Sequence, residues 1–436
     1  MPGDTRPYVV PGRPTGPRTT SPQPPAPVPR SWLVRFTLAW LGLWMAYLVP
    51  SQLTLPDQLD RLDHSGRIGD YAVINAVAGV AALVTLPLFG ALCDRTRIRF
   101  GRRRTWMAAG LGVFAAGLAA TGAQTTATGV GAAWLVATLG FNMATVGFTA
   151  AVADQVPEAQ RGKVSTAIYG PQAVGLVLGL AALSSFRDTP LRYAALAIGV
   201  VAFGWPFVRR TRDTAPPAPD AAAPCAGTGP PRPAAGRRPA SAPRPYGTRR
   251  TNEFAWAFGS RLLINLANVL TNSYLLFFIK DGLKAADPDR ALLALTSVYL
   301  AFTLLATYGG SALSDRTGRR RVFVAGAAAA QATACLVLAL VPAFGAAFLA
   351  AALLGAGYGA YMAVDQVVIM QVLPEERDRA KDLGIMNIGA FVPSSLGPLA
   401  AGALISASGG YRLLFVVAAV VSVLGAAAVS RITSVR

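Results

Sequence analysis

Long apolar stretches alternate with short polar segments along most of the chain. An α-helix needs about 20 mainly apolar residues to cross the ~30 Å hydrocarbon core of a bilayer, and twelve stretches are of about this length. They lie near residues 32–56, 70–92, 105–124, 130–152, 163–184, 191–208, 253–280, 291–313, 321–341, 346–369, 380–406 and 411–430. The pattern predicts an all-α membrane protein with twelve transmembrane helices, since lipid accepts only backbone whose polar groups are bonded internally.

Two polar segments interrupt this pattern. Residues 1–30 contain ten prolines and four arginines, and residues 209–252 contain ten prolines and nine arginines. Such compositions neither pack a core nor span lipid, so we predict a disordered tail and a flexible linker. The linker separates two predicted six-helix bundles, at 31–208 and 253–430, and a short tail follows at 431–436.

An internal repeat relates the two predicted bundles. The segment Gly90–Arg104, GALCDRTRIRFGRRR, recurs as Ser311–Arg321, SALSDRTGRRR. In each copy an Asp-Arg pair ends one apolar stretch, a glycine permits a tight turn, and arginines open the next stretch. A second motif also occurs twice: Val156-Pro157-Glu158 precedes the fifth stretch, and Leu373-Pro374-Glu375 precedes the eleventh. The chain is therefore predicted to consist of two homologous halves.

Composition and charge agree with a membrane protein. Hydrophobic residues make up 53% of the chain and charged residues 14%, with a mean hydropathy of +0.44, so much of the apolar surface must face lipid. The net charge of +19 resides in short loops rather than on one face, which argues against nucleic-acid binding. Of 40 Lys and Arg, 30 fall on one side of the predicted topology and 8 on the other. We predict a protein of the plasma membrane, and the positive-inside rule then predicts that its termini and linker are cytoplasmic.

Residues for metal binding and catalysis are scarce. The three cysteines, Cys93, Cys225 and Cys335, show no ligand spacing, and His64 is the single histidine. We therefore predict no metal, no cofactor and no disulfide. The sequence also lacks a GxxxxGK[ST] phosphate loop and a cluster of nucleophile and base, which argues against an ATP-driven pump and against an enzyme.

The repeated loop carries a family resemblance. The segment Asp315-Arg316-Thr317-Gly318-Arg319-Arg320 resembles the signature between helices 2 and 3, and between helices 8 and 9, of major facilitator superfamily transporters. The first copy is longer, with Gly101 seven positions after Asp94, and its spacing resembles that of sucrose transporters and of the glycoside-pentoside-hexuronide symporters. The resemblance covers about residues 31–430. It implies two pseudo-symmetric bundles that work by alternating access around a central cavity.

The same resemblance implies a conformational gate, in which the Asp-Arg pairs stabilise the outward-open state. Each aspartate can accept hydrogen bonds from a neighbouring helix N-terminus and from loop arginines. The alternative for the arginines is that they only fix the orientation of the helices in the membrane. Asp154 lies three residues before Pro157, near the predicted cytoplasmic surface, where a gate or cap role is favoured. The candidate gate residues are Asp94, Arg95, Gly101, Arg102, Asp154, Asp315, Arg316, Gly318 and Arg319.

Asp365 is the candidate for proton coupling. It lies nine residues before Pro374, which marks the end of its helix, and is therefore ~13 Å deep in the membrane. Inserting an ionisable group at that depth costs at least ~2.5–3.5 kcal/mol of free energy, so its presence there indicates a function. Burial favours the protonated form of a carboxyl group, as coupling requires, and the adjacent Gln366 is a candidate for substrate binding. The alternative is a packing role through hydrogen bonds to neighbouring helices.

A polar stripe marks the seventh predicted helix. Arg261, Asn265, Asn268 and Asn272 recur at spacings of 4, 3 and 4, which places them on one helical face. Such a face lines a water-filled cavity or packs against another helix. Amides and a guanidinium suit hydroxyl-rich solutes, so the stripe is a candidate substrate site; interhelical hydrogen bonding is the alternative.

Weaker signals lie in other helices. In the first helix Arg35 occupies a position analogous to Arg261, and Tyr47 and Ser51 are weaker candidates for substrate binding. Glycines are predicted to allow close helix contact rather than to bind ligand. These glycines are Gly110, Gly112, Gly117, Gly355, Gly357 and Gly359.

Two differences from the sucrose-transporter pattern leave the identity of the substrate undecided. Thr138 and Thr149 stand where sucrose transporters carry an intramembrane Asp and Arg, and Gly170-Pro171 with Gly175 partly resembles the GPxxGG element of drug–proton antiporters. We predict secondary active transport of a small solute, such as a sugar or glycoside, by proton-coupled symport in a monomer embedded in lipid. The alternative is proton antiport that exports a drug, an antibiotic or another hydrophobic metabolite.

Overall fold

The computed structural model describes residues 27–96, 101–157, 160–211, 248–317, 320–372 and 379–431, and within these ranges it contains helices and no strand. The first half comprises α1 (Arg30–Val49), the π-helix η1 (Pro50–Thr54), α2 (Leu55–Leu62), α3 (Arg67–Arg95), α4 (Arg102–Gly122), α5 (Ala127–Gln155), α6 (Arg161–Leu183) and α7 (Thr189–Arg210). The second half comprises α8 (Thr248–Ser273), α9 (Leu275–Phe277), the π-helix η3 (Phe278–Gly282), α10 (Pro288–Thr317), α11 (Arg320–Leu340), α12 (Phe344–Val372), α13 (Arg379–Ser408) and α14 (Arg412–Ser430).

The helices account for the predicted membrane spans. Among the described residues, eleven helices are long and apolar enough to cross a bilayer, and the pair Glu253–Ser273 and Leu275–Gly282, bent by 41°, makes a twelfth. The all-α membrane fold is thus confirmed. The first span differs from its prediction, because the helix continues beyond Pro56 to Leu62. Pro56 directly follows the π-helix η1, and the carbonyl of Ser51, five residues before it, accepts a hydrogen bond from the Tyr71 hydroxyl at 2.7 Å.

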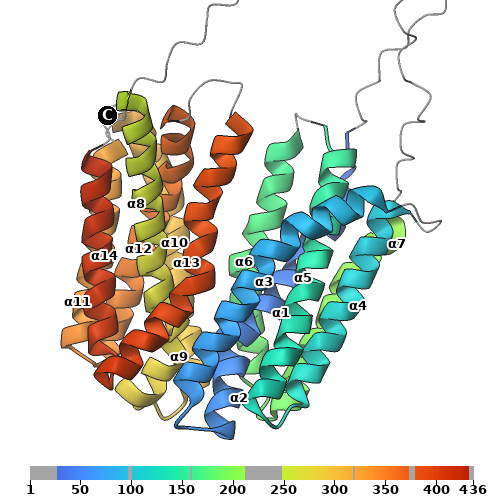
Figure 1. Cartoon of the computed structure of the whole chain (residues 1–436), viewed down its shortest axis with the longest axis horizontal. Coiled ribbons are helices and arrows are strands. Elements are labelled where there is room, and N and C mark those ends of the chain that lie inside the picture. The colour runs from blue at the N-terminus through green and yellow to red at the C-terminus, as the bar shows by residue number, and fades with distance from the viewer. Residues whose placement is uncertain are drawn as a thin grey trace, which may run out of the picture.

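The helices form two bundles that stand side by side (Figure 1). Helices α1 to α7 form one bundle and α8 to α14 the other, and α3 of the first packs against α13 of the second. Their contact is close: a Cβ added to Gly79 would lie 2.5 Å from Ser395 Cα, and one added to Gly402 would lie 2.7 Å from Ala72 Cβ. The bundles meet near α2 and α9 and diverge toward the end where the C-terminus lies (Figure 1).

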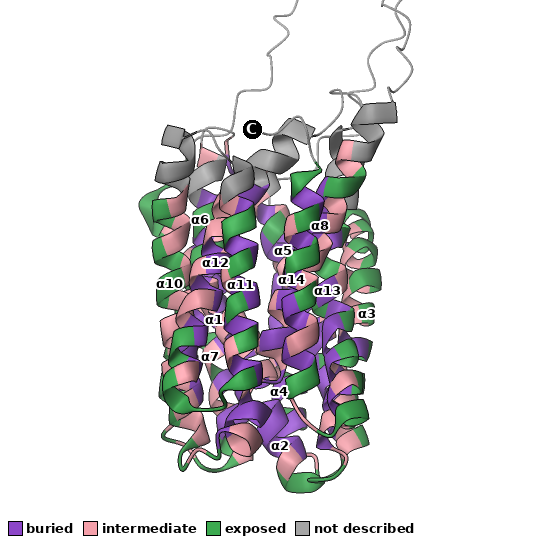
Figure 2. Cartoon of the chain, turned by 90° about the vertical axis from the view of Figure 1, so that its left-hand side faces the viewer, coloured by how far each residue is buried: buried purple, intermediate pink, exposed green. Residues whose placement is uncertain are grey.

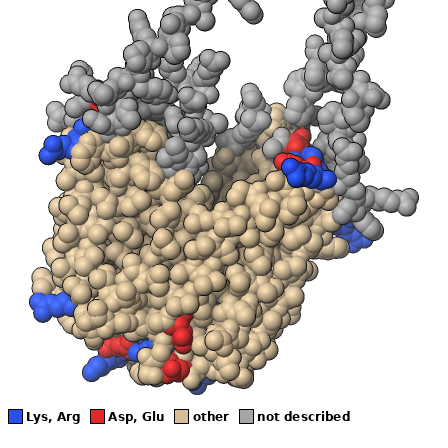
Figure 3. All heavy atoms as spheres, viewed as in Figure 1, with Lys and Arg blue, Asp and Glu red and all other residues tan. Residues whose placement is uncertain are grey.

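The surface has the distribution expected of a protein in lipid. Large apolar side chains project outward from the long helices, as at Val84 of α3 (60% exposed) and Leu305 of α10 (68% exposed). Figure 2 shows exposed residues along the outer helices and buried ones in the interior. On the face drawn in Figure 3, charged residues gather at the two ends and leave an uncharged band between them. Such a band matches the hydrocarbon core of a bilayer.

Glycines bring several helices into backbone contact, as predicted. A Cβ added to Gly110 of α4 would lie 2.3 Å from Ala144 N of α5, and one added to Gly355 of α12 would lie 2.1 Å from Tyr299 O of α10. Close approaches also occur at Gly117, Gly357 and Gly359. Gly112 was expected to share this role and does not, because it faces outward with nothing within 4 Å of its added Cβ.

Two substitutions in one helix test this distinction. Gly110→Ala should lower the free energy of unfolding by roughly 1–3 kcal/mol, because its methyl group collides with the backbone of α5. Gly112→Ala should leave it unchanged or raise it by about 0.5–1 kcal/mol through helix propensity. Melting of the purified variants in detergent measures both. Equal effects at the two positions would contradict the packing assigned to Gly110.

Candidate functional site

A cavity of about 400 Å³ lies between the two bundles. The space-filling view shows a hollow between the halves at the end where they diverge (Figure 3). Its polar lining from the first bundle consists of Gln52, Tyr169 and Gln172. The polar lining from the second bundle consists of Asn268, Asn272, Thr296, Tyr299, Thr303, Thr307 and Tyr358. Among the described residues that line this cavity, none carries a charge, so its walls offer amides, hydroxyls and aromatic rings.

The predicted polar stripe of α8 divides between this cavity and the interior of the second bundle. Asn268 and Asn272 line the cavity. Asn268 Nδ2 donates to the hydroxyl of Tyr299 on α10 at 3.0 Å, and Asn272 Nδ2 donates to the carbonyl of Asn268 at 2.9 Å. The stripe therefore serves both of the roles considered from the sequence, since Asn268 lines the cavity and also holds α8 to α10, whereas Asn272 lines the cavity and bonds within α8.

The other end of the stripe forms a buried ion pair. Arg261 Nη1 lies 2.6 Å from Asp365 Oδ2, and the two residues are 6% and 5% exposed. Tyr361 donates its hydroxyl hydrogen to Asp365 Oδ1 at 2.7 Å. Removing one partner of such a pair typically costs ~3–5 kcal/mol, because the other charge remains buried without compensation. The sequence indicated Arg261 and Asp365 as two separate candidates, and the tertiary structure brings them into contact.

A chain of hydrogen bonds connects this ion pair to the cavity wall. Tyr358, which lines the cavity, donates to Asn265 Oδ1 at 3.4 Å. Asn265 Nδ2 in turn lies 3.4 Å from the Tyr361 hydroxyl, which donates to Asp365. A change in the charge of Asp365 can therefore be transmitted to the cavity through side chains in direct contact.

The first helix presents a different face to the cavity from the one expected. Tyr47 stacks on Phe141 inside the first bundle, with 4.3 Å between ring centroids, and Ser51 Oγ donates to the carbonyl of Leu48 at 2.9 Å. Neither Tyr47 nor Ser51 lines the cavity, whereas Leu48 and Gln52, each one residue further along, do. A helix that is apolar on nearly all sides gives no periodic signal from which its rotation can be predicted. Gln52 was therefore not predicted as a residue that lines the cavity.

Several predicted residues lie outside what the structure describes. Gly318 and Arg319 fall outside the described residues. Asp315, Arg316 and Gln366 lie on described helices, but their side chains are outside the described set.

The first copy of the repeated loop forms a cluster within the first bundle. Arg103 Nη1 donates to Asp94 Oδ1 and Arg103 Nε to Asp154 Oδ2, each at 2.8 Å. Arg102 Nη2 lies 3.4 Å from Asp154 Oδ2. Arg103 thus joins Asp94 to Asp154, and Arg102 contacts the same Asp154, so three predicted gate residues lie together; Arg103 was not among the predicted gate residues. Arg103 is the buried member of its arginine run, and burial is decided by the packing of α3, α4 and α5.

Two further residues complete this loop. Gly101 precedes α4 with a φ of 94°, a backbone conformation that side-chain-bearing residues rarely adopt. Arg95 is exposed at the end of α3. The turn into α4 therefore depends on glycine, and Arg95 is a surface residue.

At the opposite end of the molecule, ion pairs join the two bundles. Arg67 of α3 donates to Asp281 of η3, with Nη2 at 2.8 Å from Oδ1 and 2.7 Å from Oδ2. Lys280 Nζ lies 2.8 Å from Asp57 Oδ1 and 2.7 Å from Asp60 Oδ2 of α2. The sequence did not reveal these pairs, because partners more than 200 residues apart are both read as ordinary loop charges.

Further contacts strengthen the same junction. Arg192 of α7 is paired with Asp289 of α10, and the Tyr411 hydroxyl donates to Asp281 Oδ2 at 2.5 Å. Tyr274 donates to the carbonyl of Ile68 at 3.2 Å. The bundles are thus closed against one another at this end, while the cavity opens toward the other.

Comparisons with known proteins place the fold. A family model described as Major Facilitator Superfamily matches residues 36–307 and, in a second alignment, 262–435. The structure resembles the crystal structure of a mutant of the nucleoside transporter NupG, with a TM-score of 0.66 and 14% identity over 92% of this chain and 100% of that one. It also resembles a bacterial homologue of the human lysosomal transporter Spinster in an inward-facing and occupied conformation, with a TM-score of 0.68 and 15% identity over 93% and 97%. No characterised protein matches the sequence significantly.

The ion pairs between the bundles predict a conformational response. Asp281→Asn should favour separation of the bundles at this end by roughly 1.5–3 kcal/mol, because Arg67 is 7% exposed and loses a charged partner. Labelling by a maleimide should report the separation in an Ala72→Cys variant without the native cysteines, since Ala72 is buried at the contact with α13.

A matched control lies in the same loop. Asp287 pairs with Arg290 on the surface, with side chains 50% and 81% exposed, and such pairs contribute about 0–1 kcal/mol. Asp287→Asn should therefore leave the labelling rate at Ala72→Cys nearly unchanged. If Asp281→Asn behaved like this control, the ion pairs would have no part in closing this end.

Proposed function

The chain belongs to the major facilitator superfamily, and from this premise we propose that it moves a small neutral solute, a sugar or glycoside, across the plasma membrane by proton-coupled symport. It is a transporter and not an enzyme. The observation that carries the coupling proposal is the buried pair of Arg261 and Asp365, connected by hydrogen bonds to an uncharged cavity between the bundles.

Alternating access is supported by the unequal ends of the molecule. Arg67 with Asp281, and Lys280 with Asp57, join the bundles at one end, and the cavity opens at the other. With the termini and the linker on the cytoplasmic side, as the positive-inside rule favours, this arrangement is the inward-facing state. Transport then requires these ion pairs to separate and the opposite end to close.

The repeated loops are proposed to act at that opposite end. Arg103 holds Asp94 and Asp154 within the first bundle, and Arg95 is exposed. We assign the Asp94 loop and its copy at 315–319 to a gate that holds the outward-open state. The long first copy also supports placing the chain near the sucrose-transporter-like branch. The protein is proposed to work as a monomer.

A neutral, hydroxyl-rich substrate fits the cavity walls. A volume of about 400 Å³ lies within the ~300–1,000 Å³ typical of small-molecule sites. Gln172, Asn268 and Asn272 offer amide donors and acceptors, and the rings of Tyr299 and Tyr358 offer flat surfaces for a sugar ring. A charged substrate would enter without a countercharge among the described lining residues, which is costly away from water.

Proton coupling follows from the chemistry of the ion pair. A proton on Asp365 neutralises the carboxylate and removes the partner of the Arg261 guanidinium, whose Nε already lacks a hydrogen-bond partner among the described residues. Arg261 then needs another acceptor, and Tyr361 and Asn265 lose the geometry that the carboxylate imposed. Because Tyr358 connects this chain to the cavity, proton binding and solute binding can influence one another.

Export by proton antiport is the second candidate, and it is favoured by the apolar part of the cavity. Leu48, Leu176, Leu300 and Met362 line it beside the polar groups, and such walls suit a hydrophobic compound. Gly175 of the GPxxGG-like element also lies against α1, where an added Cβ would be 3.2 Å from Leu41 O. The ion pair couples protons in either direction, so a transport measurement has to separate the two.

Proteoliposomes with an imposed pH gradient test the coupling. Wild type should accumulate a sugar, a glycoside or a nucleoside when protons flow inward. The double variant Arg261→Gln/Asp365→Asn should lose this accumulation and keep solute exchange at equal pH, because removing both charges avoids a lone buried charge. Asp188→Asn, at an exposed carboxylate, is the control and should behave like wild type. Expulsion of lipophilic compounds without sugar uptake would establish the antiporter instead.

Substrate contact is tested at the asparagines. Asn268→Ala should raise the transport KM roughly three- to tenfold, since a lost hydrogen bond is worth about 0.5–1.5 kcal/mol. Asn75→Ala is the matched control, because Asn75 bonds to the carbonyl of Tyr71 and does not line the cavity. Concentration dependence of uptake measures both. A KM unchanged by Asn268→Ala, with only the protein yield reduced, would assign the asparagines to packing.

A further inference from the structure

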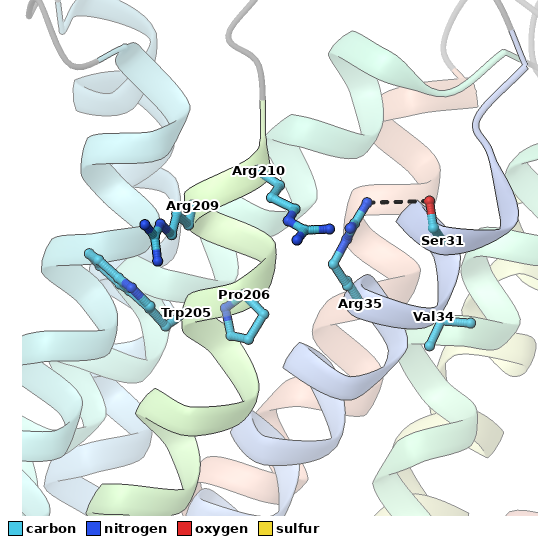
Figure 4. Close-up of a pocket in the computed structure, with 7 residues that line it drawn as sticks. All are labelled: Ser31, Val34, Arg35, Trp205, Pro206, Arg209 and Arg210. Atoms are coloured by element: carbon cyan, nitrogen blue, oxygen red, sulfur yellow. Dashed lines mark hydrogen bonds between the residues drawn. The ribbon is translucent and has the colours of Figure 1, made fainter.

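A second concave site lies on the outer face of the first bundle, between the start of α1 and the end of α7. It encloses about 590 Å³ and is lined by three arginines, Arg35, Arg209 and Arg210, together with apolar groups that include Val34 and Trp205. Figure 4 shows Arg35 and Arg210 extending from the two helices into the same space. All of its described lining residues belong to the first bundle, and none of them lines the cavity between the bundles.

Within the described residues, no negative charge balances the arginines of this groove. Arg35 Nη2 lies 3.4 Å from Ser31 Oγ, and no carboxylate among the described residues forms an ion pair with Arg35, Arg209 or Arg210. The buried arginines behave differently, because each is paired with an aspartate. These are Arg67, Arg103, Arg192 and Arg261. Guanidinium groups that converge without a countercharge repel one another, and an anion between them removes the repulsion.

The groove is also amphipathic along the membrane normal. Arg209 and Arg210 end α7, whereas Trp205 and Val34, which are 46% and 57% exposed, lie further toward the apolar band. Tryptophan is favoured at the membrane–water interface, and apolar side chains below it suit an acyl chain. A cationic rim above an apolar wall matches the shape of a phospholipid, with its phosphate at the arginines and its chain along α1 and α7.

We propose that this groove binds the headgroup of an anionic phospholipid from the surrounding bilayer. Arginine forks bind phosphate oxygens in pairs, and a basic pocket between transmembrane helices is a suitable geometry for such a headgroup. A free phosphate ion would use the arginines and leave Trp205 and Val34 without a ligand, so the lipid is the occupant that uses the whole surface. The proposal is independent of which solute is transported and in which direction.

Native mass spectrometry of the full chain tests this site, with phosphatidylglycerol as the probe and phosphatidylcholine as the neutral comparison. Wild type should retain one phosphatidylglycerol in preference to phosphatidylcholine. Arg35→Gln/Arg210→Gln should reduce that retention by about fivefold for each arginine removed. Arg35→Lys/Arg210→Lys keeps the charge and should restore most of the binding, which separates loss of the site from a folding defect.

The control removes two exposed arginines elsewhere. Arg187→Gln/Arg431→Gln should retain phosphatidylglycerol as wild type does, because neither residue lines the groove. The proposal is overturned if Arg35→Gln/Arg210→Gln retains as much lipid as wild type, or if the control loses as much as that variant. It is also overturned if millimolar inorganic phosphate displaces the lipid completely, since a simple anion site would then explain the arginines.

Discussion

The absence of water across the bilayer is the constraint on which this structure depends. Backbone polar groups must bond within helices there, and a charge must lie at an end of the molecule or be paired. Arg261 and Asp365 satisfy the second condition by binding one another in the interior of the second bundle. Their position carries a cost that packing alone does not require, because apolar residues of similar size would fill the same space more cheaply. This cost is the physical reason to connect the pair with proton coupling.

Water reaches the two ends of the molecule, and the ion pairs at these ends hold helices or bundles together. Arg67 is buried at the junction between the bundles, while Lys280, Asp60 and Asp281 are partly accessible, and separating the bundles exposes these charges to water rather than to lipid. The free-energy cost of opening is therefore moderate, as a reversible transition needs. At the other end, Arg103 satisfies Asp94 and Asp154 within one bundle and leaves the cavity accessible. The two ends thus differ in whether their charges are paired between or within bundles.

In the proposed mechanism, neutral groups of the cavity bind the solute, and the ion pair of Arg261 and Asp365 binds the proton. Asn268, Asn272 and Tyr299 present hydrogen-bonding groups without charge, which suits a solute that must leave as readily as it enters. Tyr358 belongs to the cavity wall and to the hydrogen-bond chain that ends at Asp365. A proton and a solute can therefore occupy different sites and still affect the same helices, α8 and α12. The arginine groove between α1 and α7 shares no lining residue with this cavity.

The sequence by itself determined the twelve apolar spans, the two related halves, and the ionisable and amide residues that lipid makes expensive, among them Asp365 and Asn268. These are local properties, since the length of an apolar run and the presence of a charge within it are read from consecutive residues. Only the tertiary structure decided that Arg261 binds Asp365, that Gln52 rather than Tyr47 faces the cavity, and that Lys280 reaches Asp57. Helix rotation and contacts between distant segments depend on packing among all the helices, and uniformly apolar helices carry almost no periodic signal of either.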